Sequence, residues 1–293
     1  MYTKETVNSG DMVEIVKRVK QSRPSGRRAG RSKPTREDQK QRNARRRQKT
    51  LERRIVANFK NGDWWVTLTF RLAIGKKEMQ KTLKAFFQIL RRKYGEHGQR
   101  YLYCTERGGK TDHDLSGNII HTGGRWHAHL LLPKEIEFLD IKEAWKRAGK
   151  DAAGRAYADA VNTLPDARKL AQYMLKEADR KGPGERAYSK GAAIIDPETR
   201  EEEISAKSFR KQPADKIKIK GKTYRLEEYE IYDDPFTLEN VLYARYFAEG
   251  AGAWNTGGKK HGKETSVHHH LYADGRSHEN KRKRIGKGRA AGV

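Results

Sequence analysis

The stretch "RWHAHLLLP" (residues 125–133) decides the fold, because its side chains alternate between two kinds. In a β-strand, residues i and i+2 point to the same face, so His127 and His129 share one face. The apolar residues on the opposite face are Trp126, Ala128, Leu130 and Leu132. An apolar face of this kind needs a layer of helices over it. The stretch therefore predicts a strand of a sheet whose histidine face is open.

The segments around this strand predict strands and helices in alternation. Period-2 runs predict further strands at 61–70, 100–107 and 154–161, and helical periodicity predicts helices at 76–94, 140–150 and 164–182. A polar loop joins 100–107 to 125–133 as a hairpin, so these two strands are antiparallel. The expected class is α+β, with a mostly antiparallel central sheet, helices on one face, and the other face free to meet a ligand.

Composition divides the chain into four parts. Residues 1–34, which end in "RPSGRRAGRSKP", are expected to be a disordered basic tail. Residues 35–190 hold the predicted sheet together with a basic N-terminal helix. Residues 191–250 are expected to be a small accessory segment with a β-hairpin at 215–232 around Gly221 and a short helix at 237–250. Residues 251–293 are expected to be a basic, glycine-rich, disordered tail.

The charge of the chain predicts a polyanionic partner. Lys and Arg number 64 against 38 Asp and Glu, a net charge of +26, and nucleic acid is the usual partner of such a surface. The basic helix is expected to contact phosphates, the alternative being a solvated charged face. The arginines concerned are Arg45, Arg46, Arg47, Arg53 and Arg54. No apolar run is long enough to span a bilayer or to form a signal peptide, so we expect a cytoplasmic protein without a membrane partner. A single cysteine, Cys104, excludes disulfide scaffolds and cysteine-ligated zinc within one chain.

Four residues could together carry out phosphoryl transfer. Two imidazoles on one strand face, His127 and His129, can bind one divalent ion, although an isolated pair is more often two half-exposed histidines. Tyr173 and Lys176 are three residues apart on the helix 164–182 and are therefore neighbours. The ammonium group favours an ionised phenol or a phosphate beside it. A tyrosine nucleophile beside a metal site is suited to covalent attack on a phosphate. The alternative for Tyr173 is a core position.

Three motifs together resemble those of the HUH endonucleases, the rolling-circle replication initiators of plasmids and phages. In the order of that family they are "WVTLTF" (65–70), "WHAHLLL" (126–132) and "YMLK" (173–176). The segments "NARRRQKTLERRIVANFKNGDWWVTLTF" (43–70) and "GERAYSKG" (184–191) are similar to a subset from bacterial mobile elements. The resemblance covers roughly residues 40–190.

The resemblance implies a fold like an RNA-recognition domain, with both histidines on a central strand. It implies Mg²⁺ or Mn²⁺ and a nick in single-stranded origin DNA. Tyr173 would become linked to the 5′ phosphate and release a 3′ hydroxyl that primes synthesis, while Lys176 would position the metal or the phosphate. In conjugative relaxases the tyrosine usually precedes the histidines, whereas here it follows them. Two-tyrosine initiators repeat the tyrosine one helical turn later, where this chain has Glu177. These features predict a single-tyrosine initiator.

The third metal ligand is expected on the neighbouring strand, where Glu106 is the choice. Strand parity groups Glu106 with Leu102 and Cys104, which are expected to face the core, so a β-bulge would have to turn it toward the histidines. The alternatives in the following loop are Asp112, His113, Asp114 and His121. The triplet His268–His270 is expected to bind metal only adventitiously.

Two other functions fit the same motifs. One is a non-catalytic RNA- or DNA-binding protein with the same sheet, and the other is a single-tyrosine HUH transposase. Trp65 shares a face with Thr67 and Thr69 and is expected to bind DNA by stacking on a base. No phosphate-binding Gly-Lys-Ser/Thr motif is present, so a fused helicase is not expected. For residues 192–293, binding of duplex DNA and recruitment of a host helicase and polymerase both stay open, as does the oligomeric state.

Overall fold

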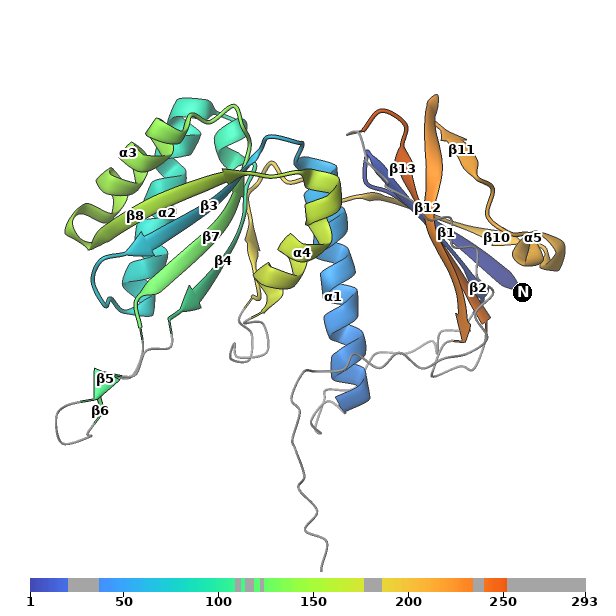
Figure 1. The fold of residues 1–293 in the computed structure, drawn as a ribbon, viewed down its shortest axis with the longest axis horizontal. Helices are drawn as coiled ribbons and strands as arrows, with labels where there is room; N and C mark the ends of the chain where they lie inside the picture. The colour runs from blue at the N-terminus through green and yellow to red at the C-terminus, as the bar shows by residue number, and fades with distance from the viewer. Residues whose placement is uncertain are drawn as a thin grey trace, which may run out of the picture. The chain divides into compact units, whose positions relative to one another are not determined.

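The computed structural model describes residues 1–20, 37–108, 112–113, 119–121, 124–176, 186–233 and 240–251 (Figure 1). Its strands form two larger antiparallel sheets, one of five strands and one of six, and helices pack against them. The predicted α+β class is confirmed at this level. None of the helices in the described ranges combines the length and apolar composition needed to cross a membrane.

The five-stranded sheet contains the strand with both histidines. Its strands are β8 (Ala153–Ala160), β3 (Trp64–Phe70), β7 (Trp126–Leu132), β4 (Leu102–Arg107) and β9 (Ser189–Lys190), in this spatial order. Every neighbouring pair is antiparallel. All four predicted strands are therefore present, and β7, which carries both histidines, is the central one.

Two helices cover one face of this sheet. They are α2 (Lys76–Tyr94) and α3 (Phe138–Gly149), which contact each other and begin and end close to the predicted bounds. The buried side chains between these helices and the sheet include Val66, Leu68, Phe86, Ala128, Leu130, Leu132 and Trp145. The apolar side chains of β7 lie on this face, as strand parity predicts, and α2 ends at Gly95, whose φ of 57° lies in the left-handed region.

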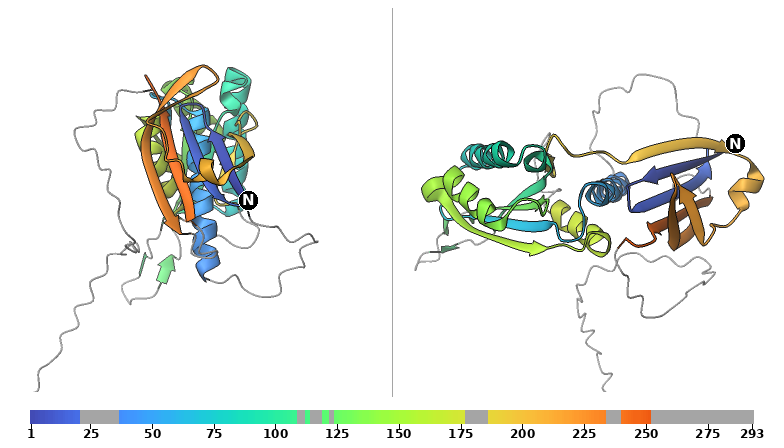
Figure 2. Two further views of the ribbon diagram at one scale, coloured as in Figure 1. Left: turned by 90° about the vertical axis from the view of Figure 1, so that its right-hand side faces the viewer. Right: turned by 90° about the horizontal axis from the view of Figure 1, so that it is seen from above.

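The opposite face of the sheet is also partly covered, so the prediction of helices on one face only is wrong. Helices α1 (Glu37–Asn58) and α4 (Thr163–Leu175) lie side by side and pack on this face (Figures 1 and 2). Apolar stripes on the two helices meet an apolar part of the sheet, and these residues include Leu51, Ile55, Phe59, Leu102, Cys104, Leu131, Ala167, Ala171 and Met174. Each helix has an apolar face that must leave water, and this end of the sheet provides the matching surface.

The six-stranded sheet contradicts two predictions. Its strands are β10 (Glu198–Ile204), β1 (Tyr2–Asn8), β2 (Met12–Val19), β13 (Asn240–Ala248), β12 (Lys222–Asp233) and β11 (Lys216–Ile219). Residues 2–19 are therefore a hairpin rather than part of a disordered tail, because Met12 and Val13 are buried in the interior. The segment expected to be a helix at 237–250 contains β13 instead. It pairs with β12 on one side and β2 on the other, which buries most of its residues.

The predicted hairpin at 215–232 is confirmed as β11 and β12. Lys220 and Gly221 form its turn with φ of 49° and 80°, the conformation of the two-residue turns that match strand twist. The remaining short elements are β5 (Asp112–His113), β6 (Ile119–His121), α5 (Ala206–Arg210), η1 (His97–Gln99) and η2 (Lys150–Ala152). Residues 21–34 and 252–293, for which basic tails are predicted, lie outside the described residues.

Candidate active site on the central strand

His129 is held in a fixed orientation in the middle of the five-stranded sheet. Its side chain is buried, and Thr67, directly opposite on β3, places its hydroxyl 3.1 Å from Nδ1. The Trp65 ring stacks on the imidazole with 5.7 Å between centroids and 9° between planes. If the Thr67 hydroxyl accepts the Nδ1 proton, the lone pair of Nε2 faces away from β3. One edge and one face of the ring are thus fixed by neighbouring side chains.

Tyr173 projects from α4 onto this histidine. Its hydroxyl lies 3.2 Å from Nε2 of His129, and the two rings meet edge to face with 4.9 Å between centroids. The buried apolar stripe of α4 runs through Ala171 and Met174, whereas Tyr173 is 39% exposed. The alternative of a core position for Tyr173 does not describe this contact. The tyrosine and the histidine lie on the same face of the sheet, as the motif spacing predicts.

Glu106 reaches the same histidine without a β-bulge. It lies opposite His127 in the pairing of β4 with β7, which has no register shift, and its Oε1 is 3.3 Å from Nε2 of His129. The expectation that strand parity would turn Glu106 away from the histidines was wrong. Leu102 and Cys104 are buried as predicted, but under α1 and α4 on the histidine face. Glu106, two residues further along β4, therefore faces the histidines in regular strand geometry.

Burial controls the protonation of the two groups in contact. It lowers the pKa of His129, although the hydrogen bond and charge of Glu106 oppose this, so a neutral imidazole is favoured. Burial also raises the pKa of Tyr173, and the negative charge of Glu106 adds to that effect. Lys176 holds its ammonium group 5.8 Å from the centre of the tyrosine ring. The expected shift of Tyr173 toward the phenolate is not found, because burial and the carboxylate of Glu106 both raise its pKa.

The donor types at this site fit a divalent cation. Two atoms with lone pairs, Oε1 of Glu106 and Nε2 of His129, face each other at 3.3 Å, which is favourable only with a proton or a cation between them. His127 is the next imidazole on the same face, with Glu106 opposite it in register. In the described ranges, no group of three or more His, Cys, Asp and Glu residues surrounds a common point. Of the three predicted ligands, the fold brings Glu106 and His129 into contact.

The alternative third ligands cannot be placed. The side chains of Asp112, His113 and His121 lie outside the described residues, as do all of Asp114 and the triplet His268–His270.

The three residues of β3 that were expected to bind DNA have contacts within the protein. Trp65 is half-buried between His129 and Tyr173, meeting the tyrosine edge to face at 5.7 Å. Thr67 contacts His129, and the hydroxyl of Thr69 accepts a hydrogen bond of 2.7 Å from the backbone N–H of Arg155. These side chains therefore shape the site around His129.

The five arginines of α1 that were expected to contact phosphates divide into two groups. Arg53 and Arg54 form ion pairs within the protein, with Glu14 and Asp196 respectively. The other three are Arg45 and Arg46, which are exposed, and Arg47, which is half-buried. Of these five arginines, the exposed ones are therefore in the N-terminal half of α1.

A part of the histidine face was missed in the sequence. Strand β8 places Tyr157 on this face, opposite Thr67, and the hydrogen bond from Arg155 to the Tyr157 hydroxyl brings the arginine to the same side; both residues are exposed. The available signal was the alternation in "AGRAYADA" (153–160), where Ala156 and Ala158 pack into the core under α2 and α3 and the residues between them point the other way.

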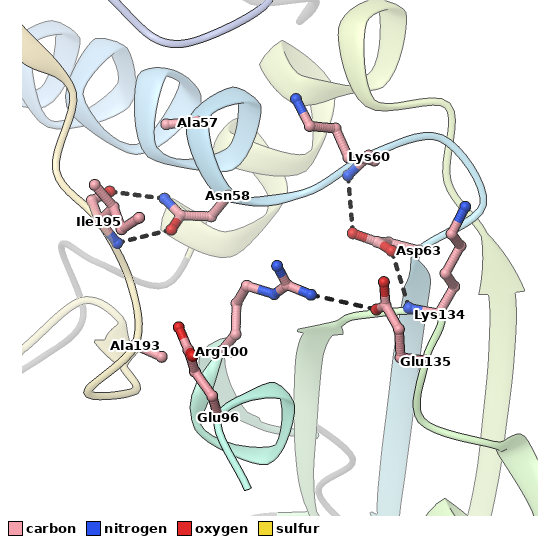
Figure 3. Close-up of a pocket in the computed structure, with 10 residues that line it drawn as sticks. All are labelled: Ala57, Asn58, Lys60, Asp63, Glu96, Arg100, Lys134, Glu135, Ala193 and Ile195. Carbon is pink, nitrogen blue, oxygen red and sulfur yellow. Dashed lines mark hydrogen bonds and ion pairs between the residues drawn. The ribbon is translucent and has the colours of Figure 1, made fainter. Parts of the chain in front are cut away.

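A cavity of about 320 Å³ lies at the other end of this sheet, where β3 begins and β7 ends (Figure 3). Its lining consists of Ala57, Asn58, Lys60, Asp63, Glu96, Arg100, Lys134, Glu135, Ala193 and Ile195. Asp63 accepts hydrogen bonds from the backbone N–H groups of Lys60 and Lys134, at 2.8 and 2.9 Å, and Arg100 pairs with Glu135 at 3.2 Å. The lining contains neither histidine nor tyrosine, and its charges largely offset each other. The cavity is therefore separate from the site around His129.

Comparison of the chain with protein-family models, with curated proteins and with solved structures gives no match. The geometry around His129 and the sequence motifs therefore carry the functional argument by themselves.

Proposed function

We propose that this chain is a metal-dependent endonuclease and strand transferase that nicks and joins single-stranded DNA. It would act through a covalent 5′-phosphotyrosine, and by its resemblance to HUH initiators it would start rolling-circle replication at the origin of a plasmid or phage. One observation carries the proposal. The Tyr173 hydroxyl lies 3.2 Å from Nε2 of His129, and this nitrogen is also 3.3 Å from Glu106. A nucleophile, an imidazole nitrogen and a carboxylate thus meet at one point of the sheet.

The chemical step is an exchange of phosphate ester bonds. The Tyr173 oxygen attacks phosphorus, a bond forms between them, and the bond from phosphorus to the 3′ oxygen breaks. The phenolic proton passes to solvent water, and the departing 3′ oxygen takes up a proton from water. Because one phosphate ester replaces another, the reaction is reversible, and a second 3′ hydroxyl can rejoin the strand by attacking the phosphotyrosine.

The neighbouring side chains orient and charge this site. Thr67 and Trp65 fix the ring of His129, so its Nε2 stays aimed at the tyrosine hydroxyl. Lys176 is exposed beside Tyr173 and supplies a positive charge for a bound phosphate. When present, Mg²⁺ or Mn²⁺ held by His127, His129 and Glu106 would withdraw negative charge from the phosphate oxygens.

A test for the covalent intermediate uses a random-sequence pool of single-stranded DNA labelled at its 3′ end. The chain is incubated with the pool and Mn²⁺ and then denatured, so that only covalently attached label stays with the protein. We expect labelled protein from the unmodified chain and none from Tyr173→Phe. The matched control is Tyr229→Phe, which alters another exposed tyrosine on β12 and should label normally. Sequencing of the attached fragments then identifies the nicked site.

The variants His127→Ala and His129→Ala are each expected to lose the label. Normal labelling of Tyr173→Phe would refute the mechanism. Tight binding of the pool by the unmodified chain without any covalent label, in Mg²⁺ and in Mn²⁺, would also refute it and would favour a nucleic-acid-binding protein without catalysis.

A further inference from the structure

We propose that Tyr157 and Arg155 on β8 form a binding subsite for single-stranded DNA beside the candidate active site. Tyr157 would stack on an unpaired base, and Arg155 would bind the phosphate next to it. This inference deepens the proposed function and rests on it, because it names the residues that recognise the strand to be cut. Neither residue belongs to the motifs that predicted the nuclease.

The strand register places Tyr157 in one row with the candidate catalytic residues. Tyr157 lies directly opposite Thr67 on β3, and Thr67 lies directly opposite His129 on β7. The next residue in the row, on β4, is Cys104. Residues opposite each other in antiparallel strands share a face, so Tyr157 and His129 project from the same side. Two strand spacings separate them, which is about 10 Å between backbones.

Burial on β8 shows which side chains are available. Ala156 and Ala158 pack against the core under α2 and α3, while Tyr157 between them is 48% exposed. The strand is at the edge of the sheet, and β3 is its only neighbour within the five-stranded sheet. A half-exposed aromatic ring on a strand whose other face is core is a surface on which a flat apolar group can lie.

Arg155 gives this surface a charge suited to a nucleotide. Its Nη1 donates a hydrogen bond of 3.2 Å to the Tyr157 hydroxyl, and its side chain is exposed. Two contacts with Thr69 position the arginine. The backbone N–H of Arg155 donates a hydrogen bond to the Thr69 hydroxyl. The preceding residue, Gly154, lies so close to β3 that an added Cβ would be 2.5 Å from the same hydroxyl. The close packing of Gly154 on Thr69 therefore fixes the backbone position from which the Arg155 side chain projects.

The charges along β8 also give the direction of the bound strand. Asp159 is exposed on the same face, on the other side of Tyr157 from Arg155. A phosphate is attracted toward Arg155 and repelled from Asp159. With a base on Tyr157 and the scissile phosphate near His129, the strand would therefore run past the Arg155 end of β8.

The experiment measures binding without catalysis. All variants are made with Tyr173→Phe, which removes the nucleophile, and fluorescence anisotropy follows a labelled mixed-sequence single-stranded DNA of about 16 nucleotides. We expect Tyr157→Ala to weaken binding by about 5- to 150-fold, the usual effect of losing one base stack, and Tyr157→Trp to restore it. Arg155→Ala should weaken binding and lower the slope of log affinity against log salt by about 0.7, the value for one lost contact to a single-strand phosphate.

Two controls make the result specific. Tyr229→Ala removes an exposed tyrosine from the other sheet and should leave binding unchanged. A duplex of the same sequence should bind equally well to the chains with Tyr157 and Tyr157→Ala, because its bases are already stacked. Unchanged single-strand binding by Tyr157→Ala, or an equal loss for the duplex, overturns the subsite.

The subsite and the proposed nuclease can fail separately. A chain with the native Tyr173 that forms no covalent adduct, while Tyr157→Ala still weakens single-strand binding, refutes the nuclease and supports the subsite as a binding surface. An adduct that depends on Tyr173, together with unchanged binding by Tyr157→Ala, refutes the subsite and supports the nuclease.

Discussion

Replacing Glu14 with Gln should destabilise the protein by an amount that depends on pH. Glu14 lies on β2, is 1% exposed, and accepts hydrogen bonds from Arg53 of α1 and from Tyr243 and Arg245 of β13. Arg245 lies 3.1 Å from its carboxylate and, on its other side, 3.1 Å from Glu52. The carboxylate thus holds two buried or half-buried arginines between α1 and the six-stranded sheet, and glutamine keeps its shape while removing its charge.

The magnitude follows from the pKa of this carboxyl. Burial opposes its charged form, but the charges of Arg53 and Arg245 and the hydrogen bond from Tyr243 outweigh burial and lower the pKa from 4.5 to about 2. At about 1.4 kcal/mol for each pH unit between the two values, the ionised form stabilises the fold by about 3 kcal/mol. Because the folded pKa is lowered, this stability is fully present above pH 4.5 and is lost as the pH falls toward 2.

Urea unfolding of the native chain and of Glu14→Gln between pH 7 and pH 3 measures this difference. We expect a gap of about 3 kcal/mol in the free energy of unfolding at pH 7, which narrows steadily below pH 4.5. Other groups titrate in both chains, so their effects largely cancel in the difference. The control Glu202→Gln removes an exposed ion pair with Lys4 and should change stability by at most about 1 kcal/mol. A gap that is small at pH 7, or that does not change with pH, would refute the reasoning.

Three further substitutions test the site and its frame. Thr67→Val removes the hydroxyl that orients His129 and should slow covalent adduct formation by about 10- to 100-fold. The melting temperature should stay nearly unchanged. An unchanged rate of adduct formation would contradict the role of Thr67. Gly154→Ala would bring a Cβ within 2.6 Å of the Thr69 backbone oxygen and should cost about 1–3 kcal/mol in urea unfolding. Gly221→Ala meets no atom within 4 Å but keeps a φ of 80°, so a loss of about 1–2 kcal/mol is expected from backbone conformation alone, and a neutral result would argue against this turn.

Much of the five-stranded sheet could be predicted because its signals are local. Alternation along β3 and β7, the apolar stripe of α2 and the hairpin between β4 and β7 depend on neighbours within a few residues, and each is found where it was expected. The six-stranded sheet escaped prediction for the opposite reason. Strands β1 and β2 pair with each other, but the strands that flank this hairpin, β10 and β13, follow about 190 and about 230 residues later along the chain. No segment near residues 2–19 therefore indicates the rest of the sheet. Without the partner, the hairpin resembles the start of a basic tail.

The sequence by itself determined which residue types are present and which side of each strand they occupy. It placed His127 and His129 on one face of a strand and Tyr173 with Lys176 on one helix, because parity and helical spacing are properties of a short segment. Only the tertiary structure decided that α4 crosses the histidine face and brings the hydroxyl of Tyr173 to His129. It also decided that Glu106 needs no bulge, since the direction in which a strand's apolar face points depends on which helices cover it. That choice results from burying the faces of α1 and α4, which are distant in sequence.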